Sequence, residues 1–104
     1  MLYLVSGTMH SRDLLSRPHE EFIEVVKGKV APSLKLIEQF QKEGMLLAGG
    51  IPAGSQDLVF ILNLPVGETH FAVRRLLLQL PIFPFYQWQV KPLETFEEWS
   101  SLVG

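Results

Sequence analysis

Apolar residues along the chain follow two kinds of spacing, and these predict both strands and helices. Short runs that are apolar at nearly every position are typical of buried strands, and apolar residues three and four apart are typical of helices. Strands are expected at 2–7, 45–52, 57–64 and 85–90, and the main helices at 19–43 and 69–80. The spacing of Thr95 and Glu98 is that of a capping box and predicts a short helix over 95–102.

The first predicted helix has an interruption at its centre. Gly28 and Pro32 lie four residues apart, and a proline ring clashes with the carbonyl group four residues before it. Glycine at that position makes a bend easier. We therefore expect either a kink or two helices that meet near 29–31. A straight helix over 19–43 would be about 37 Å long, more than a small domain easily covers.

Two prolines mark the connection from the second helix to the last strand. Pro81 has no N–H and ends the helix, while Pro84 favours an extended Phe83 that leads into the strand. Ile82 and Phe83 are too apolar for a solvated loop. This corner is therefore expected to pack against the rest of the protein.

The order strand, helix, strand, strand, helix, strand predicts an α+β, ferredoxin-like domain with an antiparallel sheet. Right-handed connections place both helices on one face and put the first and third strands side by side in the centre, where we expect them to run parallel. The other face then presents apolar residues that no long helix covers. We expect a second copy to cover it in a homodimer. The alternative is that the short C-terminal helix folds under its own sheet.

Composition supports a single ordinary domain of 104 residues in which 47% are hydrophobic and only 19% are charged. The low charged fraction agrees with a surface partly covered by another subunit. A net charge of −2 without a basic stripe argues against a nucleic-acid partner, and the lack of cysteine excludes disulfides. No apolar run suits a membrane span or a signal peptide, so a cytoplasmic protein is expected.

The corner sequence Gln79-Leu80-Pro81-Ile82-Phe83-Pro84-Phe85 resembles the corner between helix and strand in the muconolactone isomerase family. The segment Gln39-Phe40-Gln41-Lys42-Glu43-Gly44 is similar to the end of that family's first helix. The resemblance implies a dimeric α/β barrel whose dimers assemble further. It also implies a role in bacterial breakdown of aromatic compounds. The expected reaction is a cofactor-free shift of a double bond in a small lactone or cyclic acid by proton transfer. The resemblance assigns no catalytic role to a numbered residue.

Candidate catalytic residues follow from the expected parallel central strands, whose C-terminal ends would form one edge of the sheet. The three histidines all map to that edge, and a histidine or a buried glutamate suits the base that such a reaction needs. Arginine suits a substrate carboxylate, which it pairs through two hydrogen bonds. The expected catalytic residues are His10, His19 and Glu20, and the expected substrate-binding residues are Arg12, Asn63, His70 and Arg74, with Arg17 as a further arginine.

Each of these residues also has a plain structural explanation, because polar side chains are common in loops and at helix starts. Glu20 suits the positive end of a helix dipole. The histidines and Glu20 match no metal-ligand spacing, so no metal is expected. The resemblance implies that no cofactor is used. Tyr3, Tyr86 and Trp88 either line a pocket for a planar ligand or belong to the core or an interface. The alternative function is a non-catalytic small-ligand-binding or accessory protein on the same barrel.

Overall fold

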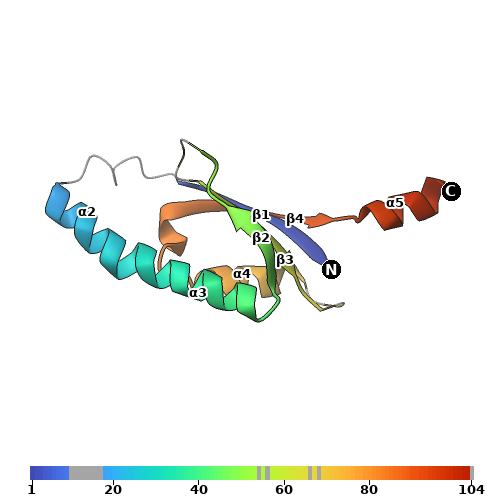
Figure 1. Cartoon of the computed structure of the whole chain (residues 1–104), viewed down its shortest axis with the longest axis horizontal. Helices are drawn as coiled ribbons and strands as arrows, with labels where there is room; N and C mark the ends of the chain where they lie inside the picture. The colour runs from blue at the N-terminus through green and yellow to red at the C-terminus, as the bar shows by residue number, and fades with distance from the viewer. Residues whose placement is uncertain (10–17, 54, 56, 66, 68, 104) are drawn as a thin grey trace.

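A four-stranded antiparallel sheet with helices on one face forms the body of the protein in this computed structural model (Figure 1). The structure describes residues 1–9, 18–53, 55, 57–65, 67 and 69–103. Its strands are β1 (Leu2–Met9), β2 (Leu46–Gly50), β3 (Leu58–Asn63) and β4 (Tyr86–Leu93), in the order β2-β3-β1-β4. This small α+β architecture is consistent with a ferredoxin-like fold.

The helical segments agree in position with the sequence pattern. The first is a continuous run of α2 (His19–Val25), the π-helical η1 (Val26–Val30) and α3 (Ala31–Lys42). The second is α4 (His70–Leu78), and the chain ends with α5 (Phe96–Val103). A short 3-10 helix, η2 (Phe83–Phe85), lies between α4 and β4.

The two central strands run antiparallel, which corrects the parallel arrangement expected from the sequence. Leu2 pairs with Asn63, and Gly7 pairs with Leu58. A helical connection returns β2 in the direction of β1, and the short connection into β3 then reverses the chain. The end of β1 therefore lies beside the start of β3, and the end of β3 lies beside the start of β1.

The predicted interruption in the first helix is a π-helical segment rather than a break. The N–H of Ala31 donates to the carbonyl of Val26, five residues earlier. The wider turn lies just before Pro32, which has no N–H to give to the usual carbonyl. The helix therefore continues, and α2, in which no residue is fully buried, extends past the end of the sheet (Figure 1).

The core lies between the sheet and the helices α3 and α4, which occupy the same face (Figure 1). Alternate residues of β1 are buried, among them Tyr3 and Val5, while Leu2 and Leu4 point to the opposite face and are only half-buried. The helices bury an apolar stripe against this layer. The remaining buried apolar residues are Phe40, Leu46, Leu58, Phe60, Leu62, Leu64, Val73, Leu77, Leu80, Ile82 and Trp88.

The corner between α4 and β4 is packed as predicted, but the path of its turn differs. Ile82 is 5% exposed, and the N–H of Phe85 donates to its carbonyl at 2.9 Å. Phe83 begins a 3-10 turn and is not extended as expected. Pro84 lies in the first positions of that turn, where a missing N–H costs nothing.

Trp88 closes one end of the core against β1. It pairs with Gly7 across the two strands, and a Cβ added at Gly7 would lie 2.7 Å from the ring atom Cζ3 of Trp88. Its Nε1 donates to the carbonyl of Phe83 at 3.1 Å, and the Trp88 and Phe83 rings stack with centroids 6.1 Å apart. Only a residue without a side chain fits beneath this ring, so Gly7 allows the corner to pack on β1.

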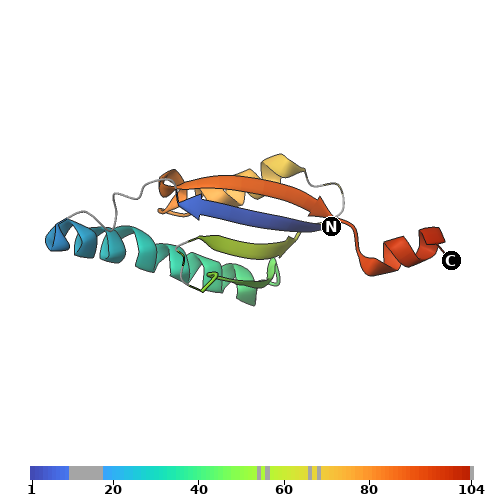
Figure 2. The same ribbon diagram turned by 90° about the horizontal axis from the view of Figure 1, so that it is seen from above.

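The C-terminal helix α5 forms at the predicted place but lies away from the sheet of its own chain. The Oγ1 of Thr95 accepts a hydrogen bond from the N–H of Glu98 at 3.1 Å, as a helix cap. Figures 1 and 2 show the helix beyond the end of β4 and away from the sheet. Phe96 is 93% exposed and Trp99 is 56% exposed. The alternative in which this helix folds under its own sheet is therefore not the arrangement in this structure.

Ser33 is a fully buried polar residue that joins the long helix to the corner. Its hydroxyl donates to the carbonyl of Lys29 at 2.7 Å and accepts the N–H of Ile82 at 3.1 Å. Lys29 belongs to the π-helical segment, and Ile82 belongs to the turn that leads into β4. One hydroxyl therefore satisfies polar groups of two elements that are far apart in the sequence.

We expect Ser33→Ala to lower the free energy of unfolding by about 1–3 kcal/mol, because it leaves the buried N–H of Ile82 without a partner. The matched control is Ser101→Ala, since Ser101 makes the same bond to the carbonyl four residues earlier but is exposed. That control should change stability by less than about 0.5 kcal/mol. Urea unfolding followed by circular dichroism measures both, and equal effects of the two substitutions would contradict the role assigned to Ser33.

Candidate functional site

Two of the residues expected to bind substrate lie where β1 starts and β3 ends. Asn63 is the last residue of β3, and its Oδ1 accepts a hydrogen bond from the amino group of Met1 at 3.5 Å. His70 begins α4, and its ring meets the ring of Tyr3 edge-on with centroids 5.6 Å apart. Arg74 lies one turn further along α4 and is exposed. These three residues share one end of the sheet.

The described candidates for the base lie past the other end. His19 and Glu20 are the first residues of α2, both exposed, on the part of the helix that extends past the sheet (Figure 1). His10, Arg12 and Arg17 lie outside the residues that the structure describes. The antiparallel direction of β1 and β3 therefore separates the described candidates into two groups instead of bringing them to one edge.

A different pair of titratable residues lies on either side of the end of β1. The carboxylate of Asp57 accepts the N–H of Met9 through Oδ1 at 3.1 Å. Met9 pairs with Tyr86 on its other side, across β1 and β4. A carboxylate and a phenol thus flank the last residue of β1, and both side chains are half-buried.

Local structure on both sides fixes this pair. The hydroxyl of Ser55 accepts the N–H of Asp57 at 3.2 Å and donates to the carbonyl of Pro52 at 3.0 Å, which shapes the turn from β2 into β3. Tyr86 is the first residue of β4 after the proline corner, and its ring lies 5.4 Å from that of Trp88 between centroids. The turn therefore positions the carboxylate, and the corner positions the phenol.

Burial raises the pKa of Tyr86 above the ordinary value of 10.0, and the negative charge of Asp57 raises it further. Both causes disfavour the phenolate. The Tyr86 hydroxyl therefore keeps its proton through the neutral range and is a hydrogen-bond donor there. The carboxylate of Asp57, on the other side of Met9, supplies oxygen acceptors, so the end of β1 combines an acceptor with a donor.

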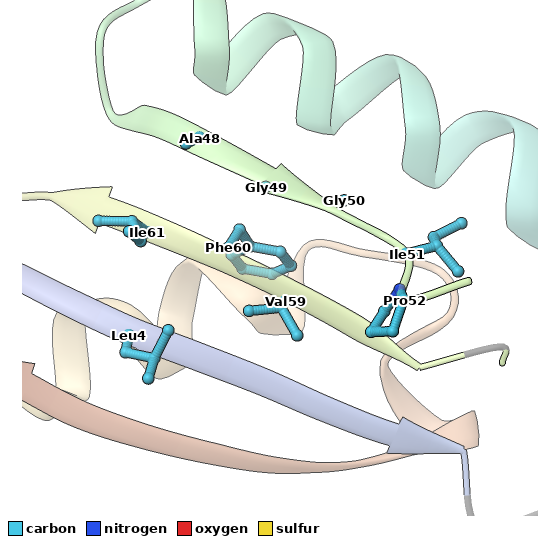
Figure 3. Close-up of a pocket in the computed structure, with 9 residues that line it drawn as sticks. All are labelled: Leu4, Ala48, Gly49, Gly50, Ile51, Pro52, Val59, Phe60 and Ile61. Atoms are coloured by element: carbon cyan, nitrogen blue, oxygen red, sulfur yellow. The ribbon is translucent and has the colours of Figure 1, made fainter. Parts of the chain in front are cut away.

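A separate apolar pocket of about 350 Å³ lies on the face of the sheet opposite the helices (Figure 3). None of its lining residues is titratable. Leu4 and Ile61 come from paired positions of β1 and β3, and β2 contributes only small residues. The lining residues are Leu4, Ala48, Gly49, Gly50, Ile51, Pro52, Val59, Phe60 and Ile61.

The small residues of β2 allow this strand to approach β3 closely. A Cβ added at Gly49 would lie 2.6 Å from the Cβ of Phe60 and 2.8 Å from the carbonyl oxygen of Val59. The strand also has a bulge between Leu46 and Ala48. Because Gly49 and Gly50 have no side chains, the strand presents bare backbone to both of its sides.

Sequence reasoning considered Tyr86 only as a possible wall of a ligand pocket and gave Asp57 no functional role. The signal that the sequence offered was the position of these two residues along the chain. Asp57 stands alone as a charge immediately before a strand that is apolar up to Asn63, and Tyr86 is the first residue after the corner. That both flank the end of β1 depends on the strand register, which the sequence did not provide.

Comparison with known proteins adds no family assignment: no protein-family model matches the chain, and no curated protein matches it significantly. Within the described ranges, no helix is both long enough and apolar enough to cross a bilayer. In the same part of the chain, no three histidine, cysteine, aspartate or glutamate side chains gather in a group that could hold a metal ion.

The raised pKa of Tyr86 predicts a loss of stability at high pH. The unfolded chain ionises this phenol near its ordinary pKa while the folded chain retains the proton, so stability should fall as pH rises through about 10 towards the folded pKa. Tyr86→Phe should lose less stability between about pH 9 and about pH 11. Urea unfolding at each pH, with tyrosinate absorbance of the folded protein, measures this effect.

Asp57→Asn provides the partial control for this titration. It removes the negative charge, which is the smaller cause of the raised pKa, and leaves the burial of Tyr86 unchanged. The pKa of Tyr86, measured by tyrosinate absorbance, should therefore move only part of the way back towards its ordinary value. A titration of Tyr86 that is unchanged in Asp57→Asn would mean that the two groups do not interact.

Proposed function

We propose that the protein is a cofactor-free isomerase that shifts a double bond in a small lactone or cyclic acid by proton transfer. The observation that carries this proposal is the pairing of the Asp57 carboxylate with the Tyr86 phenol around the end of β1. The resemblance of the preceding corner to muconolactone isomerases supports the same reaction class. Tyr86 directly follows that corner.

The proposed reaction needs a base and a hydrogen-bond donor, and no other chemistry. Asp57 removes a proton from the carbon next to the substrate carbonyl, and electrons move into the carbonyl to give an enolate. The protonated hydroxyl of Tyr86 donates a hydrogen bond to the enolate oxygen, which carries the developing charge. Asp57 then returns the proton to the carbon at the far end of the conjugated system. The double bond has moved, and no atom is gained or lost.

A non-catalytic small-ligand-binding protein is the second candidate, and the apolar pocket on the open side of the sheet favours it. The pocket is lined by Leu4, Val59, Ile61 and the backbone of β2, with no titratable side chain in its wall (Figure 3). Such a wall binds an apolar ring without activating it. In this reading Asp57 and Tyr86 stabilise the end of the sheet and have no catalytic role.

We further propose that two copies pack through the sheet face opposite the helices, here called the open face. Strand alternation places Leu4, Val59 and Ile61 on this face, and each is only half-buried in the single chain. Leu4 lies opposite both Ile61 and Lys91 in the register. The apolar part spans β1 and β3, while β4 contributes the polar residues Gln87, Gln89 and Lys91. Two such faces stacked about 10 Å apart would remove the apolar part from water.

Substitution at Asp57 and Tyr86 tests the proposed activity. Asp57→Asn should lower kcat/KM for a responsive lactone by about 10²-fold or more because it removes the base. Tyr86→Phe should lower it by a factor on the order of 10² because it removes the donor to the enolate. Absorbance assays over a panel of small unsaturated lactones and cyclic acids measure the double-bond shift.

The exposed residues His19 and Glu20 provide the controls for this assay. His19→Gln and Glu20→Gln should leave kcat/KM within a factor of about two. If Asp57→Asn turns over normally and His19→Gln loses turnover, the base lies at the start of α2 instead. If the unmodified protein binds a panel member by calorimetry but converts none, the binding function is the correct one.

The proposed pairing of open faces predicts that Ile61→Glu dissociates the assembly, because it places an unpaired charge at the centre of the apolar layer. Light scattering at micromolar concentration should give at least twice the chain mass of 11.8 kDa for the unmodified protein. For Ile61→Glu it should give the mass of a single chain. Lys91→Gln, on the polar strand of the same face, should keep the original mass. A single-chain mass for the unmodified protein would refute the pairing.

A further inference from the structure

The C-terminal helix α5 has an apolar side that is largely exposed. Phe96, Trp99, Leu102 and Val103 are each at least 56% exposed. The helix is capped by Thr95, so it is a formed helix and not an irregular tail. Figures 1 and 2 both show it projecting from the end of β4. Apolar groups gathered in this way on a projecting helix are typical of a segment that docks on another surface.

A groove on the helix-covered side of the sheet has the shape and chemistry to receive it. The groove, of about 280 Å³, lies between α3 and the edge strand β2 and is here called the α3–β2 groove. Leu34 and Ile51 at its rim are 47% and 57% exposed. Gly49 and Gly50 provide a wall of bare backbone. Its lining residues are Leu34, Ile37, Gln41, Leu46, Gly49, Gly50, Ile51, Leu58 and Phe60.

The helix α5 does not lie in the α3–β2 groove of its own chain (Figures 1 and 2). It follows β4, and the groove lies beside β2, at the opposite edge of the sheet. Adjacent strands are about 4.8 Å apart, so the two edge strands are separated by about 14 Å. Only Glu94 and Thr95 connect β4 to α5, and such a link spans at most about 10 Å. The start of α5 is therefore held away from the groove of its own chain, which favours an occupant from another chain.

The charges of the two segments are complementary. Residues 94–103 contain three glutamates and no basic residue. Residues 27–42, which include the α3 side of the groove, contain four lysines and one glutamate. Lys35 and Lys42 each follow a groove residue by one position. The acidic α5 of another copy would meet a basic helix beside an apolar groove, which favours a second copy as the occupant.

We propose that α5 of one chain lies in the α3–β2 groove of a second copy, and that the exchange is reciprocal. This exchange uses the pairing of open faces proposed above. When a two-fold axis parallel to the strands relates two stacked sheets, β4 of each copy lies over β2 of the other. Each arm then leaves β4 about 10 Å from the partner's β2 and passes around that edge strand to the groove on the partner's helix-covered side. A fully covered aromatic side chain buries about 150–250 Å². Phe96, 93% exposed, can add most of that area, and Trp99, 56% exposed, can add about half of it. The two-fold doubles this contribution to the roughly 1,200 Å² of a stable dimer.

Cross-linking between two singly substituted full-length chains tests the proposal, since the protein has no cysteine of its own. Ser100→Cys places a thiol beside the apolar side of α5, one helical turn after Phe96. Leu34→Cys places the other thiol at the rim of the groove. One variant carries nitrogen-15, so that mass spectrometry recognises the mixed disulfide. Because each chain has one thiol, a mixed link can form only between two chains.

The matched control replaces Leu34→Cys by Phe71→Cys, which lies on α4 away from the groove and is more exposed, at 74% against 47%. Random collision would favour the control, whereas docking of α5 in the groove favours Leu34. We expect the yield of the mixed disulfide with Leu34→Cys to exceed the yield with Phe71→Cys by at least about tenfold. This excess should disappear when the chain that carries Ser100→Cys also carries Trp99→Asp and Leu102→Asp. Equal or lower yield at Leu34 overturns the proposal.

Light scattering of the full-length Trp99→Asp/Leu102→Asp variant separates this proposal from the pairing of open faces and from the isomerase activity. Weaker association with preserved circular dichroism supports the arm exchange. If this variant keeps the dimer mass and the dissociation constant of the unmodified protein, the arm exchange is wrong while the sheet pairing stands. The activity of Asp57 and Tyr86 is measured separately and does not enter this result.

Discussion

The hydroxyl of Ser33 holds together two parts of the fold that packing alone would leave less well defined. It lies in the first turn of α3 and bonds the carbonyl of Lys29, in the π-helical segment, and the N–H of Ile82, in the corner before β4. Ile82 is buried, so its N–H must have a partner inside the protein. The place where β4 begins is therefore tied to the place where the long helix changes its winding. The position of Tyr86, the first residue of β4, depends on this bond.

From that fixed corner, contacts continue to the end of β1. The Trp88 ring lies over Gly7 and stacks on Phe83, which sets the distance between β4 and β1. Tyr86 and Asp57 then flank Met9, and the carboxylate takes the place of a backbone acceptor for the last strand residue. Structural and chemical roles overlap at this end of the sheet, because the groups that close the sheet are also those that the proposed reaction uses.

The sequence was sufficient for the element order and for the packed corner, because apolar spacing, prolines and the capping residue Thr95 act locally. It was also sufficient for the direction of β3, because a hairpin that follows a crossover strand reverses the chain. The parallel pairing of β1 and β3 expected above is therefore wrong. The site was harder, because bringing Asp57 close to Tyr86 needs the register of three strands and a turn held by Ser55. The spacing of apolar residues predicts that α5 has an apolar side. Whether that side is exposed depends on the direction in which the chain leaves β4, and no local sequence signal determines this direction.

The aromatic contact between Tyr86 and Trp88 has a spectroscopic consequence. With ring centroids 5.4 Å apart, the indole is within range of efficient energy transfer to the neighbouring ring once that ring becomes a tyrosinate. Trp88 is 9% exposed and Trp99 is 56% exposed, so their emission differs in colour. The protein thus contains two intrinsic fluorophores. Trp88 reports the ionisation of Tyr86 at the end of β1, and Trp99 reports the surroundings of α5.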